Sequence, residues 1–299
     1  MSLTKQENFN HPCEQAVTMM RSTLTSEAWE RNANFVQSLK SEIESHPISS
    51  HPVIEILNNC KIDNSILQGI HLDYRYAIVQ VFTDALLAAQ LQSRQLEPRL
   101  KAGSKMAPRL LLTLNSLDEF GFRPGFDVDG YYLGNPQRAH YPLYETVLDD
   151  LDLTEAARRA YAASSAATLV RQFLEESFGD YVEVTALLAV AEHEVILFTP
   201  PLRRATGRLG IDVNDGYYFV HGVSDDDTAD AADDDHASDL WHVLTQAVTE
   251  ADYERIRERC KRYINLWSDF WDQQVAFITG PERDAEARSR NSSRSLGLR

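Results

Sequence analysis

The stretch DNSILQGIHLDYRYAIVQVFTDALLAAQLQ, from Asp63 to Gln92, indicates the fold class of this chain. Its polar start, Asp63-Asn64-Ser65, is typical of the cap that begins a helix. The apolar side chains that follow recur at steps of three and four residues, which is the spacing of a helix face turned toward a core. They are Ile66, Ile70, Tyr74, Ile78, Val81, Phe82, Leu86 and Leu87. We therefore expect one long, core-facing helix over residues 63–92.

The rest of the chain predicts further helices and shows no sustained strand alternation. We expect them over residues 98–120, 135–151, 154–178 and 180–198, the last ended by Pro200-Pro201, with a final long helix that breaks near Thr249. Residues 122–133 are rich in turn formers and resemble an insertion. The prediction is an all-α bundle of seven or more helices in one domain, residues 51–279. A helical extension over residues 1–50 precedes this domain, and a disordered tail over residues 280–299 follows it.

Charge, cysteine content and hydrophobicity argue against several classes of protein. The formal charge of −16 argues against binding to nucleic acid or to anionic membranes. The three cysteines, Cys13, Cys60 and Cys260, are far apart and favour reduced thiols in a cytoplasm over a disulfide framework. The first residues lack the pattern of a signal peptide, and no apolar run approaches the length of a membrane helix. We expect a soluble cytoplasmic protein.

Histidines and carboxylates gather between residues 216 and 242. Asp233 and His236 are three residues apart, so a helix would place them within about 60° of each other on one face. His221 precedes them, with Asp225 four residues after it as an alternative ligand. Asp239 and His242 form a second such pair. Imidazole and carboxylate together are ligands of non-haem iron, although an acidic, solvated loop would have the same composition.

Candidate partners lie earlier in the chain. Glu119 closes one expected helix, and His140 opens the next. Glu192 and Glu194 interrupt an apolar run, where a carboxylate must be paired, coordinated or turned to a rim. Pairing with an arginine such as Arg203 is the structural alternative. The full set of candidate metal ligands is Glu119, His140, Glu192, His221, Asp233 and His236, with Asp225 and Glu194 as alternatives. Carboxylate-rich sites of this kind in helical bundles hold two iron or manganese ions.

Motifs for other chemistries are missing from the sequence. It contains no GxGxxG or P-loop pattern for nucleotide phosphates and no GxSxG nucleophile elbow. The cysteines and histidines match no signature of a cysteine-dependent enzyme. Metal-assisted chemistry is the enzymatic hypothesis that stays open.

The order of these pieces resembles the haem-oxygenase-like diiron oxidase/oxygenase family, over roughly residues 51–275. The similar segments are Asn115-Ser-Leu-Asp-Glu119-Phe-Gly121, Gly134-Asn-Pro-Gln-Arg-Ala-His140-Tyr-Pro-Leu-Tyr144, Ala189-Val-Ala-Glu192, Leu209-Gly210, Tyr218-Phe-Val-His221 and Asp233-Asp-Asp-His236-Ala. Two stretches depart from the family pattern. Residues 122–133 lengthen the gap between the first Glu and His, and Gly222 to Ala232 lengthen the gap before the last Asp. Asp233 matches as part of Asp-x-x-His-Ala, whereas Asp225 keeps the family spacing.

The resemblance implies a haem-oxygenase-like bundle with two iron ions, dioxygen as cosubstrate and an external reductant. In the family, dioxygen reacts through a peroxo-diiron(III) intermediate. It also implies an oxidoreductase acting on a small-molecule metabolite, and we expect N-oxygenation of an amine or amino-acid-like substrate, as in natural product biosynthesis. Oxidative C–C cleavage, decarboxylation or desaturation of an amino or fatty acid is the alternative reaction. A homodimer is common for this fold. The non-enzymatic alternative is an all-α interaction module whose acidic insert binds a partner.

Overall fold

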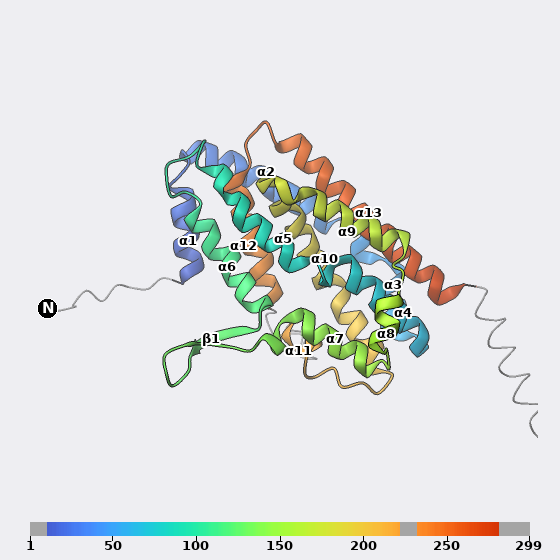
Figure 1. The fold of residues 1–299 in the computed structure, drawn as a ribbon. Coiled ribbons are helices and arrows are strands. Elements are labelled where there is room, and N and C mark those ends of the chain that lie inside the picture. The colour runs from blue at the N-terminus through green and yellow to red at the C-terminus, as the bar shows by residue number, and fades with distance from the viewer. Residues whose placement is uncertain (1–10, 222–231, 281–299) are drawn as a thin grey trace, which may run out of the picture.

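The computed structural model describes residues 11–221 and 232–280, with the backbone alone for residues 232–237. The described chain is helical apart from one hairpin (Figure 1), which confirms the predicted all-α bundle. Its helices are α1 (Pro12–Arg21), α2 (Ser26–Glu44), α3 (Pro52–Asn59), α4 (Asn64–Tyr74), α5 (Phe82–Gln92), α6 (Met106–Glu119), α7 (His140–Asp150), α8 (Glu155–Ala160), α9 (Ser165–Glu175), α10 (Tyr181–Gly207), α11 (Tyr217–Val220), α12 (Ala232–Ala247) and α13 (Tyr253–Thr279).

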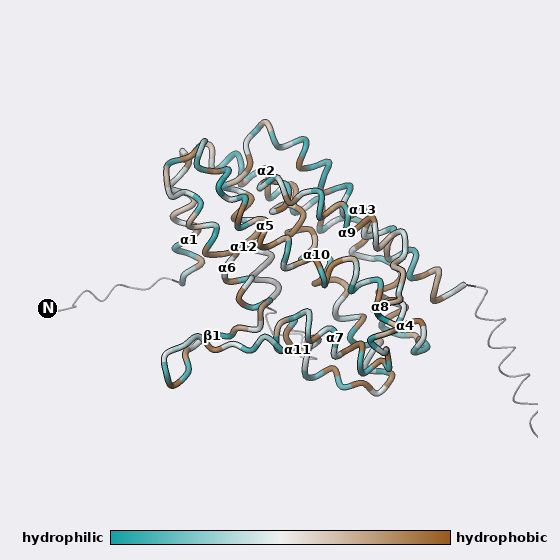
Figure 2. The backbone as a smooth tube through the Cα atoms, in the orientation of Figure 1, coloured by the Kyte–Doolittle hydropathy of each residue, from teal (hydrophilic) through white to brown (hydrophobic). Residues whose placement is uncertain are grey.

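Helix α10 lies in the middle of the bundle, and α3, α5, α12 and α13 pack around it (Figure 1). It begins where Asp180 accepts a hydrogen bond from the backbone N–H of Glu183. Most of its side chains are buried on every face, and Figure 2 shows the corresponding hydrophobic colouring along it. A helix that is apolar all round belongs at the centre of a large helical domain. Among its polar side chains, Glu192 and Glu194 are buried, whereas Arg204 is exposed.

The same helix corrects one prediction. We expected Pro200-Pro201 to end it near Phe198, but α10 continues through both prolines to Gly207. Each proline removes one backbone hydrogen bond and costs about 3 kcal/mol in a helix interior. Leu202, Ala205 and Thr206 are buried beyond the prolines. Their packing offsets that cost, which periodicity alone does not reveal.

The long helix expected over residues 63–92 is interrupted. Helix α4 ends at Tyr74, a π-helical segment covers Arg75–Val79, and α5 begins at Phe82. A π-helical turn takes one more residue per turn than an α-helix, and such turns are frequent at functional sites. The apolar stripe continues across it, because Ile78, Val79 and Phe82 are all buried. The interruption therefore changes the direction of these side chains without exposing them.

Several element boundaries also differ from the predictions. Helix α6 begins at Met106 instead of near Pro98. The helix expected over residues 154–178 divides into α8 and α9, which Thr154 and Ser164 cap separately. The turn-rich insertion forms an antiparallel hairpin of β1 (Phe122–Phe126) and β2 (Tyr132–Gly134), which projects from the bundle (Figure 1). The predicted break near Thr249 is confirmed, since α12 ends at Ala247 and α13 begins at Tyr253.

The first two helices join the same core as the rest of the chain. Met20 of α1 and Leu39 of α2 are fully buried in it. Asn32 of α2 donates hydrogen bonds to the backbone carbonyls of Thr245 and Val248, at 2.9 and 2.8 Å, at the C-terminal end of α12. None of the described helices combines the length and the hydrophobicity needed to cross a membrane.

Candidate metal centre

Glu119 and His140 meet where the chain leaves the bundle for the hairpin and returns to it. Glu119 is the last residue of α6, and His140 is the first of α7. His140 Nδ1 lies 3.0 Å from Glu119 Oε1, and both residues are buried. On the other side of the ring, His140 Nε2 lies 3.6 Å from Asp118 Oδ2. The 21 residues that separate this pair in sequence therefore do not separate it in space.

The base of the hairpin is closed tightly enough to bring the two residues together. Gly121 has φ +78°, a conformation that strongly favours glycine. A Cβ at this position would lie 2.5 Å from the carbonyl oxygen of Asn135 and 2.6 Å from the backbone nitrogen of Ala139. The backbone N–H of Asn135 also donates to the carbonyl of Gly121 at 3.1 Å. The inserted residues thus leave and re-enter the bundle at one point.

Glu192 reaches the same place from the middle of α10. It is buried, and the side-chain amide of Asn115 on α6 donates to its Oε1 at 3.0 Å. Asn115 lies one helical turn before Glu119, so one face of α6 contributes to both carboxylates. This hydrogen bond fixes the orientation of the Glu192 carboxylate inside an otherwise apolar helix.

His221 follows the short helix α11 and completes the described cluster. Its ring centroid lies 4.8 Å from that of His140 and 4.3 Å from that of Tyr217. Tyr217 in turn packs edge-to-face on Tyr144 of α7, with ring centroids 4.7 Å apart. The aromatic residues of α11 therefore anchor His221 against the helix that carries His140.

The four side chains line one small cavity. Its volume is about 20 Å³, and its wall combines two carboxylates, two imidazoles and a set of hydrophobic side chains. The hydrophobic part consists of Ile78, Val79, Phe82, Val195 and Tyr217. Two of these, Ile78 and Val79, come from the π-helical segment. The cavity wall thus combines possible metal ligands with apolar side chains.

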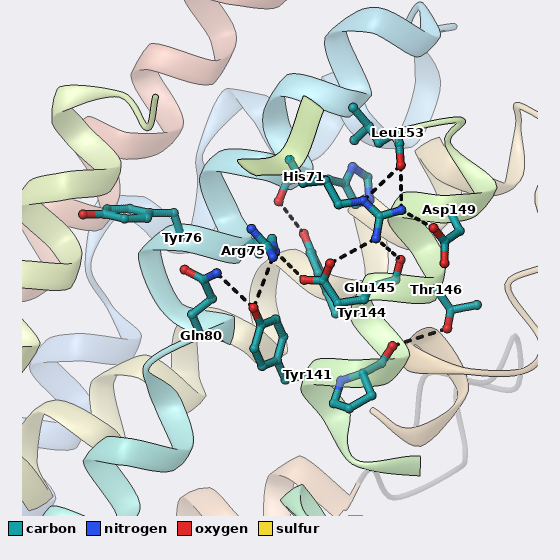
Figure 3. A network of polar contacts seen from close by, with 12 residues as sticks. His71, Arg75, Tyr76, Gln80, Tyr141, Tyr144, Glu145, Thr146, Asp149 and Leu153 are labelled. Atoms are coloured by element: carbon teal, nitrogen blue, oxygen red, sulfur yellow. Dashed lines mark hydrogen bonds and ion pairs between the residues drawn. The ribbon is translucent and has the colours of Figure 1, made fainter. Parts of the chain in front are cut away.

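A polar network holds α7 against the π-helical segment (Figure 3). Arg75 pairs with Glu145 and donates to the hydroxyl of Tyr141 at 3.2 Å. Arg158 of α8 donates to the other oxygen of Glu145 at 3.0 Å. The hydroxyl of Tyr144 donates to the backbone carbonyl of His71 on α4, also at 3.0 Å. The network fixes the relative position of the helix that begins with His140 and the segment that forms the apolar wall.

Glu194, the alternative carboxylate on α10, is held elsewhere. Tyr74 donates to its Oε2 at 3.1 Å, and the indole N–H of Trp271 donates to its Oε1 at 2.8 Å. Burial raises the pKa of this carboxyl to about 8, against the effect of its two donors. The arginine considered as its partner, Arg203, donates instead to the carbonyl of Val213 and to Asn214 Oδ1. Glu194 does not line the cavity that Glu192 lines.

The last candidates lie at or before the beginning of α12. Asp225 falls outside the described residues, as do the side chains of Asp233 and His236. The position of this part of α12 nevertheless follows from contacts further along the helix. Gln246 Nε2 donates to the carbonyl of Ser104, just before α6. Asp239, Leu240 and Val243 share a small hollow with Leu111, Leu112 and Asn115.

These contacts show that α12 runs antiparallel to α6, because the residues with lower numbers in α12 meet those with higher numbers in α6. The first turns of α12, which contain Asp233 and His236, therefore lie at the level of Glu119. Asp239 accepts a hydrogen bond from the thiol of Cys13 at 3.4 Å. With His242 it lines a separate hollow beside α1. The second Asp/His pair therefore does not join Glu119 and His140.

The described side chains are of the types that bind iron, although they do not surround an ion by themselves. Within residues 11–221 and 238–280, no group of three or more histidine, cysteine or carboxylate side chains is arranged to hold a metal ion. Two carboxylates and two imidazoles are nevertheless buried together, which is costly unless such groups are paired or coordinate a metal. The Glu119–His140 hydrogen bond satisfies part of this need. Asp118 is placed to orient His140, as a carboxylate commonly orients a metal-bound histidine.

Sequence reasoning missed several residues of this site. Asn115 belongs to one of the segments that resemble the family, but nothing in its spacing predicts a hydrogen bond to Glu192. Val79 and Val195 of the apolar wall were not predicted either. Their signal in the sequence is weak, because both look like ordinary core residues. No model of a known protein family and no curated protein matches this chain.

Proposed function

We propose that this centre binds two iron ions and activates dioxygen to oxidise a small-molecule metabolite. The observation that carries the proposal is the convergence of Glu119, His140, Glu192 and His221 on one buried cavity, from α6, α7, α10 and the residue that follows α11. Carboxylate and imidazole ligands on facing helices are the recurrent design of diiron sites in helical bundles. The position of the first turns of α12 supports Asp233 and His236 as the ligands that complete the set, with Asp225 as the alternative to Asp233.

Bound iron would supply the electrons and open coordination positions that dioxygen reduction requires. The chain's own residues would have three tasks. Asp118 would orient His140 through its Nε2, and Asn115 would orient Glu192 through its Oε1. Ile78, Val79, Phe82 and Val195 would exclude water and hold an apolar part of the substrate. Repeated turnover would need an external reductant as the electron donor.

For the reaction, we propose N-oxygenation of an amine or amino-acid-like substrate. The alternative is oxidative C–C cleavage, decarboxylation or desaturation at the same site. Mass spectrometry of products separates the reactions, because N-oxygenation adds oxygen mass, cleavage loses carbon and desaturation loses hydrogen. The test is a screen of amines, amino acids and fatty acids with the Fe(II)-loaded protein, dioxygen and a chemical reductant.

The ligand assignment is tested by metal analysis after anaerobic loading with Fe(II). The wild-type chain is expected to bind two irons, and His221→Ala and Glu192→Ala are expected to lose most of that binding. Glu194→Gln is the matched control, since it changes a buried carboxylate two residues away that faces Tyr74 and Trp271. Stoichiometric iron binding by both cavity variants would contradict the assignment. Iron binding without oxygen consumption would favour the non-enzymatic alternative of an interaction module.

A further inference from the structure

The hairpin at residues 122–134, which we name the arm, carries an exposed hydrophobic surface. Every residue of β1 is exposed, and Phe126 and Tyr132 contact each other with ring centroids 5.3 Å apart. Phe126 is 64% exposed, Tyr131 and Tyr132 are exposed by more than 70%, and Val128 is fully exposed. A two-stranded hairpin alone is marginally stable in water. Contiguous exposed apolar side chains on such an element mark an interaction surface.

A second exposed apolar surface, the α5–α6 face, lies on the helix from which the arm emerges and on its neighbour. Met106 and Leu110 on α6, and Leu87 and Leu91 on α5, are each more than 40% exposed. Both pairs have the i, i+4 spacing of one helix face. The two helices are adjacent, because Arg109 donates to the carbonyl of Gln90 and Gln90 donates to Ser116. Leu114 and Leu117, which are partly exposed, continue the α6 stripe toward the arm.

The charges on the two surfaces are complementary. The turn of the arm contains Asp127 and Asp129, and Asp127 Oδ1 accepts the backbone N–H groups of Asp129 and Tyr131. Several cationic residues lie at the end of the α5–α6 face where the two helices are connected, in a chain whose net charge is −16. Arg94 and Lys101 belong to the segment between α5 and α6, Lys105 directly precedes α6, and Arg109 is on α6. Within the described part of the chain, Lys105 pairs with Glu97, while Arg94 and Lys101 make no ion pair.

We propose that the arm and the α5–α6 face together form the interface with a second copy of this chain. Because one chain carries both surfaces, a two-fold symmetric, isologous dimer would form the arm–face contact twice. If the two α6 helices pair in antiparallel fashion, the C-terminal end of each lies beside the N-terminal end of the other. The arm, which begins two residues after α6 ends, then starts beside Met106 and Lys105 of the partner. Each arm reaches across the partner's face and places its acidic turn near the partner's cations.

The test is the mass of the full-length protein in solution, measured by sedimentation velocity over a range of concentrations. The wild type is expected at twice the chain mass of 33.9 kDa. Val128→Asp on the arm and Met106→Glu on the face are each expected to weaken the dimer at least about tenfold. Leu169→Glu on α9 is the control, because this side chain is 49% exposed and lies on neither surface. It should leave the dimer unchanged.

Mixing the two variants tests the reciprocal arrangement. A Val128→Asp chain keeps an intact face and a Met106→Glu chain keeps an intact arm, so the mixture retains one of the two arm–face contacts. The mixture is expected to form more dimer than either variant alone at the same total concentration. A monomeric wild type, or a dimer that neither variant weakens, would overturn the proposal. Because the measurement needs no metal, its failure is distinct from a failure of the proposed iron centre.

Discussion

The side-chain amide of Asn115 donates a hydrogen bond to Glu192 Oε1 at 3.0 Å, and both residues are buried. This contact joins α6 to the central helix α10 at the level of the cavity. It also links the segment that ends in Glu119 to the second carboxylate of the candidate centre. Removing a partner that orients a metal ligand commonly costs a factor of 10–100 in metal affinity.

We therefore expect Asn115→Ala to weaken Fe(II) binding by about 10- to 100-fold while leaving the fold intact. Anaerobic Fe(II) titration measures the change, and circular dichroism checks the fold. Ser116→Ala is the control, because Ser116 is the next residue on α6 and is also buried, but bonds to the carbonyl of Leu112 and to Gln90. Equal affinities for the Asn115→Ala variant and the wild type would show that Asn115 does not position Glu192 for metal.

Gly121→Ala should destabilise the base of the hairpin. The new Cβ would lie 2.5 Å from the Asn135 carbonyl oxygen, so the backbone must move. Gly130→Ala is a matched comparison, since Gly130 also has a positive φ, +81°, but has no atom within 4 Å of an added Cβ. We expect about 1 kcal/mol of destabilisation at Gly130 from the backbone conformation. Crowding at Gly121 should add at least about 2 kcal/mol more.

Chemical denaturation of the two glycine variants measures this difference. The Gly121 variant should also bind less Fe(II), because Glu119 lies two residues before the strained position and His140 follows Ala139. Similar stability losses for both variants would show that the tight contacts at Gly121 relax without cost.

The Arg75–Glu145–Arg158 network should contribute measurably to stability. Glu145→Gln leaves the buried guanidinium of Arg158 with weaker partners and removes the carboxylate from Arg75. Glu145 is itself partly exposed, so we expect a loss of about 2 kcal/mol, below the range for a fully buried pair. Urea denaturation measures it. Glu155→Gln, which removes a fully exposed pair with Arg159, should change stability by less than about 0.5 kcal/mol.

Stability should fall in mild acid because of His71. This histidine is completely buried, and burial lowers its pKa from 6.5 to about 4. Its Nδ1–H donates to the carbonyl of Leu67, so Nε2 accepts from the hydroxyl of Tyr218 and the ring is neutral. Protons bind more readily to the unfolded chain between these pH values. The stabilising contribution is therefore complete above pH 6.5 and is lost as the pH falls toward 4.

A shift of this size corresponds to about 3 kcal/mol across that window. Denaturation curves at intervals from pH 7 to pH 4, for the wild type and for His71→Gln, isolate the contribution from that of the carboxylates. The variant should be less stable at pH 7 and should lose less stability on acidification. Parallel pH profiles would show that His71 does not carry this dependence.

Periodicity alone was sufficient for the helical class and for most helices of this chain. The apolar spacing of residues 63–92 predicted helix, and α4 and α5 confirm the helical state but not one continuous helix. The break near Thr249 is confirmed as well. The same patterns could not reveal the π-helical segment at Arg75–Val79. The apolar stripe stays buried although a turn of the π-helical segment contains one extra residue. Packing against α7 and α9 determines the geometry of this segment. The helix through Pro200 and Pro201 likewise depends on packing beyond the prolines.

For the candidate site, too, some features could be predicted from the sequence and others could not. Residue type and order in the sequence predicted Glu119, His140, Glu192 and His221 as candidate ligands and kept Glu194 as an alternative. Only the tertiary structure decided that Glu192 faces the cavity, while Glu194 meets Tyr74 and Trp271. The physical reason is that both carboxylates lie in a stretch of α10 that is buried on most of its faces. Its sequence therefore specifies burial but not direction, and the helices packed around it determine which carboxylate meets the histidines.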